Sequence, residues 1–210
     1  HRKSGRMPIS GTIRYEVFKR AKFHCELCGV SAEERALEVD HIVPKNHGGE
    51  DSINNYQALC YSCNASKGDR DDTDLREMKF EYKKRVEKCL FCEIPQKRII
   101  AENNLAVVIS DKYPVTKDHS LIIPKRHSMH YFELNQAEIN AINALACMLK
   151  GKLEEKDRSI EGINIGFNCG EYAGQTIMHT HMHFIPRRIG DVQKPTGGIR
   201  NIIPGKGMYQ

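Results

Sequence analysis

The sequence NCGEYAGQTIMHTHMH, residues 168–183, is the most informative part of this chain. It ends in three histidines spaced by two, His179, His181 and His183. Successive side chains of a β-strand point to opposite faces, so a strand here predicts three imidazoles on one face. Packing alone does not explain the pattern, because each buried imidazole needs a polar partner. A three-histidine metal centre is one chemical interpretation.

Strand and helix patterns extend outward from this stretch. The strand candidates are 105–110, 119–123, 162–168 and 177–185. A long helix is predicted to begin at Asn135, where Glu138 completes a capping box. Its buried face is expected to carry Ile139, Ile142, Leu145, Leu149 and Leu153. Strands around one long helix predict an α+β domain.

Two further motifs accompany the histidines: CLFC at 89–92 and PVTKDHSLIIPKRH at 114–127. With these motifs and the stretch at 168–183, the second half of the chain resembles the histidine triad (HIT) hydrolases. The resemblance implies a HIT-like α+β domain with an antiparallel sheet over 89–210. It also implies a homodimer formed through that domain.

Two details refine this resemblance. Residues 190–200, GDVQKPTGGIR, resemble the branch of the family that hydrolyses dinucleoside polyphosphates. The chain departs from the family pattern at Lys117-Asp118, where Pro-Gly is common before the histidine. The triad itself is intact, so the departure leaves only the shape of the adjoining loop open.

The resemblance also implies a reaction. His181 would attack the α-phosphorus of a nucleotide and form a covalent nucleotidyl-histidine, which water then hydrolyses. His183 and His119 would orient His181 and buffer its charge, and His179, the first histidine of the triad, is also counted among the catalytic residues. Dinucleoside polyphosphates or nucleoside phosphoramidates would be the substrates. The residues that would contact the ribose and the phosphates are Asp111, Asn168, Gly174, Gln175 and Thr176.

A zinc site beside these histidines follows from the same resemblance. In the zinc-containing branch, the ligands correspond here to Cys89, Cys92, His127 and His179. A set of two cysteines and two histidines suits a closed, tetrahedral zinc site. His130 is an available substitute for His127, and a simple thiol pair is the alternative.

The first half of the chain carries two more C-x-x-C pairs. Cys25 and Cys28 are separated from Cys60 and Cys63 by 31 residues. Paired thiols in an intracellular chain of this size are typical of metal sites rather than disulfides. Four thiolates suit tetrahedral Zn²⁺ with no open position, which makes this a second structural zinc site. Reduced thiols without a metal are the alternative.

The stretch LEVDHIVPKNHGGEDSINNYQALCYSCNASKG, residues 37–68, resembles the HNH endonuclease family. The resemblance implies a ββα-metal finger. Asp40 and Asn64 would bind one Mg²⁺ or similar divalent ion, for which hard oxygen ligands are suited. His41 would be the general base that activates water, and Asn55 would hold the hairpin that carries it. Asn64 stands where the family often has His, and a finger that binds nucleic acid without cleaving it is an equal alternative.

Local patterns complete the expected domain organisation. We expect an HNH-type domain over 1–70, a helical linker over 71–88 and the HIT domain over 89–210. Within the first domain, Ala36–Val43 is predicted to be a strand pair bent around Asp40-His41. Asp74 to Glu77 has the form of a capping box and is predicted to open a helix that runs to Lys88.

The charge of the chain, +5 overall, is concentrated at its N-terminus. Seven basic residues and one acidic residue occur among the first 24, and this basic arm is either a contact for DNA phosphates or a solvated tail. The basic residues are Arg2, Lys3, Arg6, Arg14, Lys19, Arg20 and Lys22. No apolar run reaches the ~18 residues of a membrane span and no signal peptide opens the chain, so a cytoplasmic protein without a membrane partner is expected.

Three functions of the whole chain are consistent with these motifs. The first is a nucleotide hydrolase with an accessory zinc finger, and this is the preferred interpretation. The second is an enzyme that removes AMP from adenylated DNA ends, with the HNH-type finger binding the DNA. The third is a metal-dependent endonuclease regulated by nucleotide binding to the HIT domain.

Overall fold

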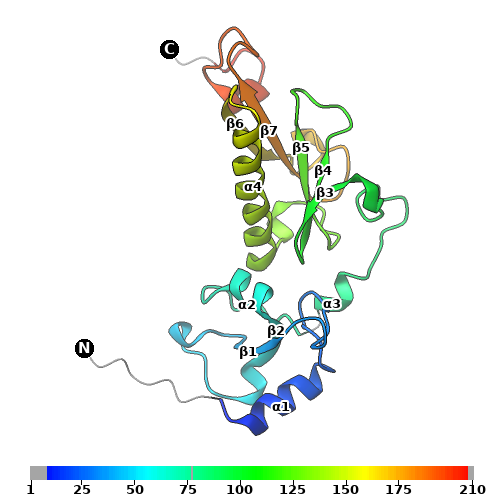
Figure 1. The fold of residues 1–210 in the computed structure, drawn as a ribbon, viewed down its shortest axis with the longest axis vertical. Helices are drawn as coiled ribbons and strands as arrows, with labels where there is room; N and C mark the ends of the chain where they lie inside the picture. Colours follow the sequence, from blue (N-terminus) through cyan, green and yellow to red (C-terminus); the bar gives the residue numbers. More distant parts are fainter. Residues whose placement is uncertain (1–8, 77, 208–210) are drawn as a thin grey trace, which may run out of the picture. The chain divides into compact units, whose positions relative to one another are not determined.

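The computed structural model describes residues 9–76 and 78–207 (Figure 1). The chain divides into two compact units. The N-terminal unit comprises the described residues up to Lys84 together with Asn135–Asn140. The C-terminal unit comprises Arg85–Leu134 and the described residues from Ala141 onward. None of the helices in the described part of the chain is long and apolar enough to cross a membrane.

The N-terminal unit is built on an antiparallel hairpin flanked by short helices. Its elements in chain order are α1 (Gly11–Arg20), β1 (Leu37–His41), β2 (Tyr56–Cys60), α2 (Tyr61–Lys67) and α3 (Met78–Glu81). Ser10 caps α1, because its hydroxyl accepts the backbone N–H of Ile13 at 3.3 Å. Val17 on α1 is fully buried against Tyr56 and Ala58 of β2, which joins the helix to the hairpin.

Two local predictions for this unit are wrong. Residues 36–43 do not fold back on themselves, since β1 is one strand whose partner is β2, with His41 opposite Tyr56. The helix predicted from Asp74 to Lys88 is present only as α3. The carboxylate of Asp74 bonds instead to the backbone and guanidinium of Arg76, and Glu77 lies outside the described residues.

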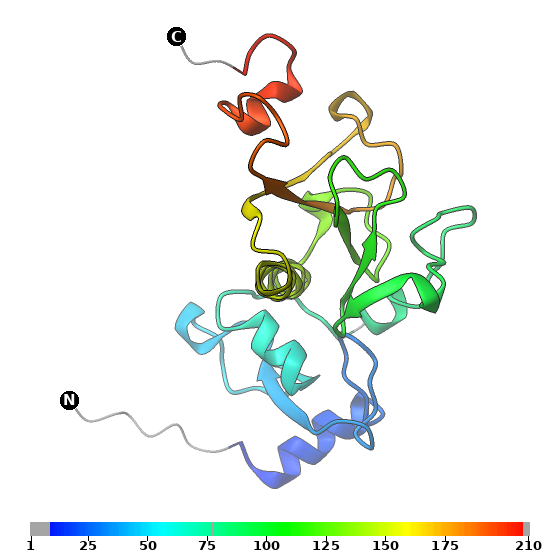
Figure 2. The same cartoon turned by 45° about the horizontal axis from the view of Figure 1, so that its top comes forward.

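The C-terminal unit contains one antiparallel sheet with strand order β3-β4-β5-β7-β6. Its strands are β3 (Ile99–Glu102), β4 (Ala106–Ser110), β5 (Ser120–Pro124), β6 (Ile160–Phe167) and β7 (Met182–Arg188). In the described parts of both units the short 3₁₀ helices are Lys45–His47, Ile53–Asn55, Gln96–Arg98, Tyr131–Glu133, Glu171–Ala173 and Gly198–Ile202. Both views show α4 (Gln136–Lys156) running alongside this sheet (Figures 1 and 2).

The predicted capping box of the long helix is confirmed. The backbone N–H of Glu138 donates to Asn135 Oδ1 at 2.9 Å, and that of Asn135 donates to Glu138 Oε2 at 3.0 Å. The helix buries Ile142, Leu145 and Leu149, as its spacing predicts, whereas Ile139 and Leu153 are only half-buried. A second buried cluster is formed by Phe91 with alternate residues of β4 and β5, namely Val107, Ile109, Leu121 and Ile123.

The last strand begins later than predicted. The period-two pattern indicates a strand over 177–185, whereas β7 begins at Met182. His179 and His181 therefore lie in the segment that enters the strand, which is bent at residues 177–179, and His183 lies within the strand. Strand β3 at the sheet edge was not expected from the sequence, since its four residues alternate between half-buried and exposed.

Candidate functional site

The segment that enters β7 holds His181 in a defined protonation state. Nδ1 of His181 lies 2.7 Å from the carbonyl oxygen of His179. A carbonyl oxygen can only accept, so Nδ1 must carry the proton and Nε2 must carry the lone pair. The imidazole is buried, and its ring stands edge-on to Phe91 at a centroid distance of 5.2 Å. His181 thus presents an unprotonated Nε2 when the ring is neutral.

A chain of hydrogen bonds leads to His183 from the neighbouring strand. The backbone N–H of Val115 donates to Nδ1 of His119 at 3.3 Å, which leaves the His119 proton on Nε2. That Nε2–H donates to Nδ1 of His183 at 3.0 Å. The proton of His183 is therefore on its Nε2, and its ring lies 5.1 Å from that of His181.

A single carboxylate stands behind this pair of imidazoles. Asp111 Oδ2 lies 3.5 Å from His119 Nε2 and 3.9 Å from His183 Nδ1. Burial lowers the pKa of both His119 and His183, and the Asp111 charge only partly opposes this effect. Both rings are therefore neutral at pH 7, and the Asp111 carboxylate lies beside them. Asp111, expected from the resemblance to contact a ribose, lies against these imidazoles and is 13% exposed.

The loop before His119 contains a feature that the sequence reasoning missed. Asp118 has φ of 68°, a left-handed conformation that favours glycine. Arg188, the last residue of β7, donates to Asp118 Oδ2 at 2.9 Å, to the carbonyl of Lys117 at 2.9 Å and to Asp157 Oδ2 at 3.0 Å. The departure from Pro-Gly at Lys117-Asp118 marks this loop in the sequence, but nothing in the sequence identifies Arg188 as its partner.

The expected phosphate-binding segment is held by its own side chains. Gln175 is buried, and its Oε1 accepts the backbone N–H of Gly170 at 2.7 Å. Its Nε2 donates to the carbonyl oxygens of Ile177, at 3.1 Å, and Met129. The structure therefore places Gln175 as a support of the loop. The remaining residues expected here, Asn168, Gly174 and Thr176, lie around it, with Asn168 Nδ2 3.4 Å from the carbonyl of Gly174.

The second set of expected zinc ligands is brought together. Ligand atoms of Cys89, Cys92, His127 and His179 all lie within 4.8 Å of one another. His179 donates from Nε2 to the carbonyl of Pro124 at 2.9 Å, so its Nδ1 lone pair faces Cys89 Sγ at 3.4 Å. Burial lowers the pKa of His179 to about 4, which keeps this donor unprotonated. A backbone carbonyl that orients a metal-binding imidazole is the usual arrangement around zinc, so these residues fit the ion.

The geometry favours His127 over His130 as the fourth member of this group. His127 Nδ1 lies 3.4 Å from Cys92 Sγ. His130 is not in the group, and its Nε2 lies 3.6 Å from Glu133 Oε1.

The four cysteines of the N-terminal unit also gather at one point. Cys25, Cys28, Cys60 and Cys63 bring their sulfurs within 4.8 Å of one another, and Cys28 Sγ lies 3.9 Å from Cys60 Sγ. Four sulfurs about 2.3 Å from a tetrahedral zinc would be about 3.8 Å apart. Hydrogen bonds from Cys28 and Cys63 lower the pKa of Cys25 to about 7, and hydrogen bonds from the other thiols also lower the pKa of Cys60, whereas the pKa values of Cys28 and Cys63 are raised. This donor set fits a closed zinc site.

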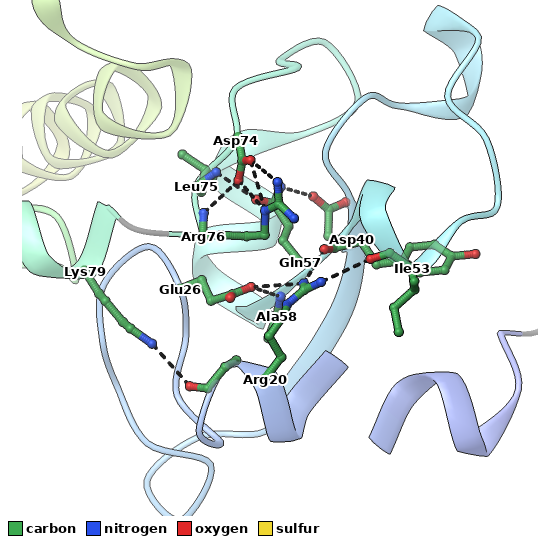
Figure 3. Close-up of polar contacts among 12 residues, drawn as sticks. Arg20, Glu26, Asp40, Ile53, Gln57, Ala58, Asp74, Leu75, Arg76 and Lys79 are labelled. Carbon is green, nitrogen blue, oxygen red and sulfur yellow. Dashed lines mark hydrogen bonds and ion pairs between the residues drawn. The ribbon is translucent and has the colours of Figure 1, made fainter. Parts of the chain in front are cut away.

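The HNH-like residues Asp40 and His41 end strand β1 and Asn64 lies in α2, and each has a different partner. His41 Nε2 lies 2.8 Å from Asp51 Oδ1. Asp40 Oδ2 lies 3.1 Å from the buried Nζ of Lys67, and it also accepts the Gln57 amide at 3.0 Å (Figure 3). Asn64 donates its amide to Glu38 at 2.7 Å. Neither Asp51 nor Lys67 was expected at this position.

Asn55 holds the loop after β1, as the resemblance implies. Its Oδ1 accepts the backbone N–H of Val43 at 2.8 Å, and its Nδ2 donates to the carbonyls of Val43 and Glu50 at 3.1 and 3.0 Å. The loop also requires Gly49, because a Cβ there would lie 1.7 Å from the carbonyl oxygen of Val43.

The basic arm is only partly within the described residues. Arg2, Lys3 and Arg6 lie outside them, whereas Arg14, Lys19 and Lys22 are exposed. Arg20 is used internally, since its guanidinium donates to the carbonyls of Ile53 and Tyr56 (Figure 3).

Comparison with known proteins assigns both parts of the chain. The family described as HIT domain matches residues 93–190, and the family described as HNH endonuclease matches residues 25–70. A HIT-like protein of Mycoplasma genitalium is 36% identical over 103 residues, which are 47% of this chain and 72% of that protein. The adenylylsulfatase HINT3 of Arabidopsis thaliana is 33% identical over 49% of this chain and 54% of its own length.

The solved structures that are similar to this chain include another histidine triad protein. A zinc-bound histidine triad family protein from Mycobacterium smegmatis is 31% identical, with a TM-score of 0.47, over 51% of this chain and 80% of that one.

Proposed function

This chain belongs to the HIT family, and on that premise we propose that its C-terminal unit hydrolyses nucleotides at the α-phosphate through a covalent nucleotidyl-histidine. Dinucleoside polyphosphates and nucleoside phosphoramidates are the substrate classes. The observation that carries the proposal is the 2.7 Å hydrogen bond from His181 Nδ1 to the carbonyl of His179, which frees Nε2 for attack.

The first step forms a bond between His181 Nε2 and the α-phosphorus. The bond from phosphorus to the leaving group breaks, and the leaving group departs with the electron pair. It is a nucleoside polyphosphate from the first substrate class, and from a phosphoramidate it is an amine that takes up a proton from solvent. In the second step a water oxygen attacks the phosphorus, the P–N bond breaks, and the water proton passes to solvent. His181 recovers its neutral form with the proton still on Nδ1.

His183 and Asp111 supply the electrostatics of this step. As His181 becomes bonded to phosphorus, its ring gains positive charge, and the Asp111 carboxylate beyond His183 stabilises that charge in a buried site. The Nε2–H of His183 is free to donate to a substrate oxygen, because its Nδ1 is occupied by His119.

The zinc ligands support the nucleophile through the backbone. Cys89, Cys92, His127 and His179 would hold Zn²⁺, which supplies structural anchoring rather than chemistry on the substrate. His179 contributes both an imidazole to this set and the carbonyl that fixes the tautomer of His181. Fixing His179 therefore positions the nucleophile.

A second candidate function is suggested by the HNH endonuclease match to residues 25–70. In this interpretation the N-terminal unit binds DNA and the triad releases AMP from an adenylated DNA end. Cleavage of DNA by the hairpin itself would require His41, whose ring is oriented by Asp51.

A substrate panel distinguishes these functions. Wild type, His181→Ala, His41→Ala and the exposed control His47→Ala are incubated with diadenosine tetraphosphate, an adenosine phosphoramidate and 5′-adenylated DNA. Under the main proposal the small nucleotides release AMP, and only His181→Ala abolishes this. Preference for adenylated DNA, lost in His181→Ala, supports the second function. DNA cleavage that survives His181→Ala and is lost in His41→Ala removes the support for the second function and indicates an endonuclease that uses His41.

A further inference from the structure

The N-terminal unit contains an open cavity of about 700 Å³ that none of the functions above uses. It lies where the end of α1, residues 24–29 and residues 74–76 and 78–83 meet. Among the residues that the structure describes, five Lys and Arg side chains line it, against two carboxylates. The cationic residues are Arg20, Lys22, Arg76, Lys79 and Lys83.

Both carboxylates are already neutralised within the walls. Glu26 is 3% exposed, and its Oε2 accepts the backbone N–H of Ala58 at 2.8 Å and lies 3.8 Å from Arg20 (Figure 3). Asp74 accepts two hydrogen bonds from the Arg76 Nε, at 2.8 and 3.0 Å. The uncompensated charge of the cavity is therefore that of three lysines, Lys22, Lys79 and Lys83.

Two of these lysines have no internal role. Within residues 9–76 and 78–207, the ammonium groups of Lys22 and Lys83 make no hydrogen bond or ion pair, and both side chains are exposed. Lys79 donates to the carbonyl of Ala21 at 3.2 Å, which fixes its amine at the cavity wall (Figure 3). Three like charges around one cavity repel one another, and a bound anion would remove that repulsion.

The backbone at the cavity rim is held in an unfavourable conformation. Lys22 and Phe23 have φ of 54° and 55°, so two consecutive residues with side chains adopt the left-handed region. Glycine is the residue that reaches this region without steric cost. Strain of this kind is concentrated at ligand sites, and here it places Lys22 at the rim.

An exposed aromatic ring completes the lining. Phe80 is 56% exposed, and the Lys79 ammonium lies 5.5 Å from its centroid. An exposed ring beside cations offers a face for a planar base next to a site for its phosphate.

We propose that this cavity is a phosphate-binding site for a nucleotide, either free or at the end of a nucleic-acid strand, held by Lys22, Lys79 and Lys83 with Phe80 against the base. The site is separate from the triad, since its lining residues all belong to the N-terminal unit. Its occupation does not depend on the proposed hydrolysis.

Binding is measured on the full-length, zinc-loaded chain in the His181→Ala background, so that nucleotides are not turned over. The ligands are inorganic pyrophosphate, AMP, and a 3′-labelled single strand with or without a 5′-phosphate. The variants are Lys22→Ala, Lys83→Ala and Phe80→Leu, and Lys152→Ala on the exposed side of α4 is the charge-matched control.

The lysine variants are expected to weaken pyrophosphate binding about tenfold each, because each removes a charge-assisted hydrogen bond. Phe80→Leu is expected to spare pyrophosphate and to weaken AMP or the strand. For a strand, each lysine variant lowers the salt dependence of log K by about 0.7. If the lysine variants lose binding only to the strand with a 5′-phosphate, the natural ligand is a strand end. If they lose binding only to AMP, the natural ligand is a free nucleotide.

Two results would overturn the proposal. One is that Lys22→Ala and Lys83→Ala bind every ligand as Lys152→Ala does. The other is that Lys22→Arg, which retains the charge, fails to restore binding while its far-UV circular dichroism is that of wild type. Turnover by the triad is measured separately from binding in the cavity. Failure of the cavity proposal therefore leaves the hydrolase proposal standing, and failure of the hydrolase proposal leaves the cavity proposal standing.

Discussion

Replacement of Lys67 by Met should destabilise the N-terminal unit more than any exposed charge change. The Lys67 side chain is 0% exposed, and its Nζ lies 3.1 Å from Asp40 Oδ2 and donates to the carbonyl of His41 at 2.9 Å. Met has a similar volume, so the apolar packing of the stem is largely kept. The change therefore isolates the loss of the ammonium group.

The magnitude follows from what Lys67→Met leaves behind. Asp40 is 17% exposed, so its carboxylate would remain largely buried without its cation, and the His41 carbonyl would lose a donor. Breaking a buried ion pair by removing one partner costs about 3–5 kcal/mol. Gln57 still donates to Asp40 at 3.0 Å, so the expected loss is about 3 kcal/mol. Adding Asp40→Asn to Lys67→Met removes the unpaired carboxylate charge and should restore most of the lost free energy of unfolding.

The assay is urea unfolding followed by circular dichroism, with zinc held constant and with pulse proteolysis to report the N-terminal unit. Lys45→Met is the control, because Lys45 pairs with the exposed Asp51 and should cost no more than about 1 kcal/mol. If Lys67→Met costs no more than this control, or if Asp40→Asn adds to the loss instead of relieving it, the reasoning about the buried pair is refuted.

Three further outcomes are expected. Cys60→Ser should lower bound zinc by about one equivalent per chain and unfold the N-terminal unit at lower urea, as measured by atomic absorption and proteolysis; unchanged zinc would contradict the four-cysteine site. Arg188→Gln should reduce kcat/KM about tenfold with little change in Tm, because it releases the loop that carries His119, and Arg188→Lys should recover part of it; a loss that follows Tm alone would indicate a purely structural role. Burial lowers the pKa of His119 and His183 in the folded state below the unfolded-state value of about 6.5. Their contribution to the free energy of unfolding is therefore fully present above the unfolded-state pKa. It is lost as the pH falls through the folded-state pKa. Tm measured from pH 8 to 5 should fall over this window, and a flat profile would contradict the assignment.

Local chemistry explains which elements could be predicted. The Asn135–Glu138 capping box and the Ser10 cap depend on residues three apart, so their geometry is contained in a few adjacent positions. The predicted helix over 74–88 was wrong for the complementary reason. Asp74 has the right spacing for a cap, but its carboxylate pairs with the nearby Arg76 instead.

The residues of the candidate sites also fall into two groups, those that local spacing identifies and those that only tertiary contacts identify. Ligand type and spacing within each C-x-x-C pair are local, so the cysteines of both metal sites could be named from the sequence. The choice of His127 over His130 could not, because it depends on the distance between side chains 35 residues apart in the chain. Lys67 was missed because its sequence context indicates only a lysine at a helix end, and its burial arises when α2 packs against β1.

Residue identity and short spacing are enough to place the C-terminal half in its family and to name the cysteines and histidines of the proposed metal sites and the proposed nucleophile, His181. How His181 would be prepared for attack depends on tertiary contacts. The His179 carbonyl fixes the His181 proton, His119 fixes that of His183, and Arg188 clamps the loop behind them. Apart from the bond between His179 and His181, these are contacts between distant segments. Protonation state and loop position are set by which atoms meet in space, and that is decided only when the strands assemble.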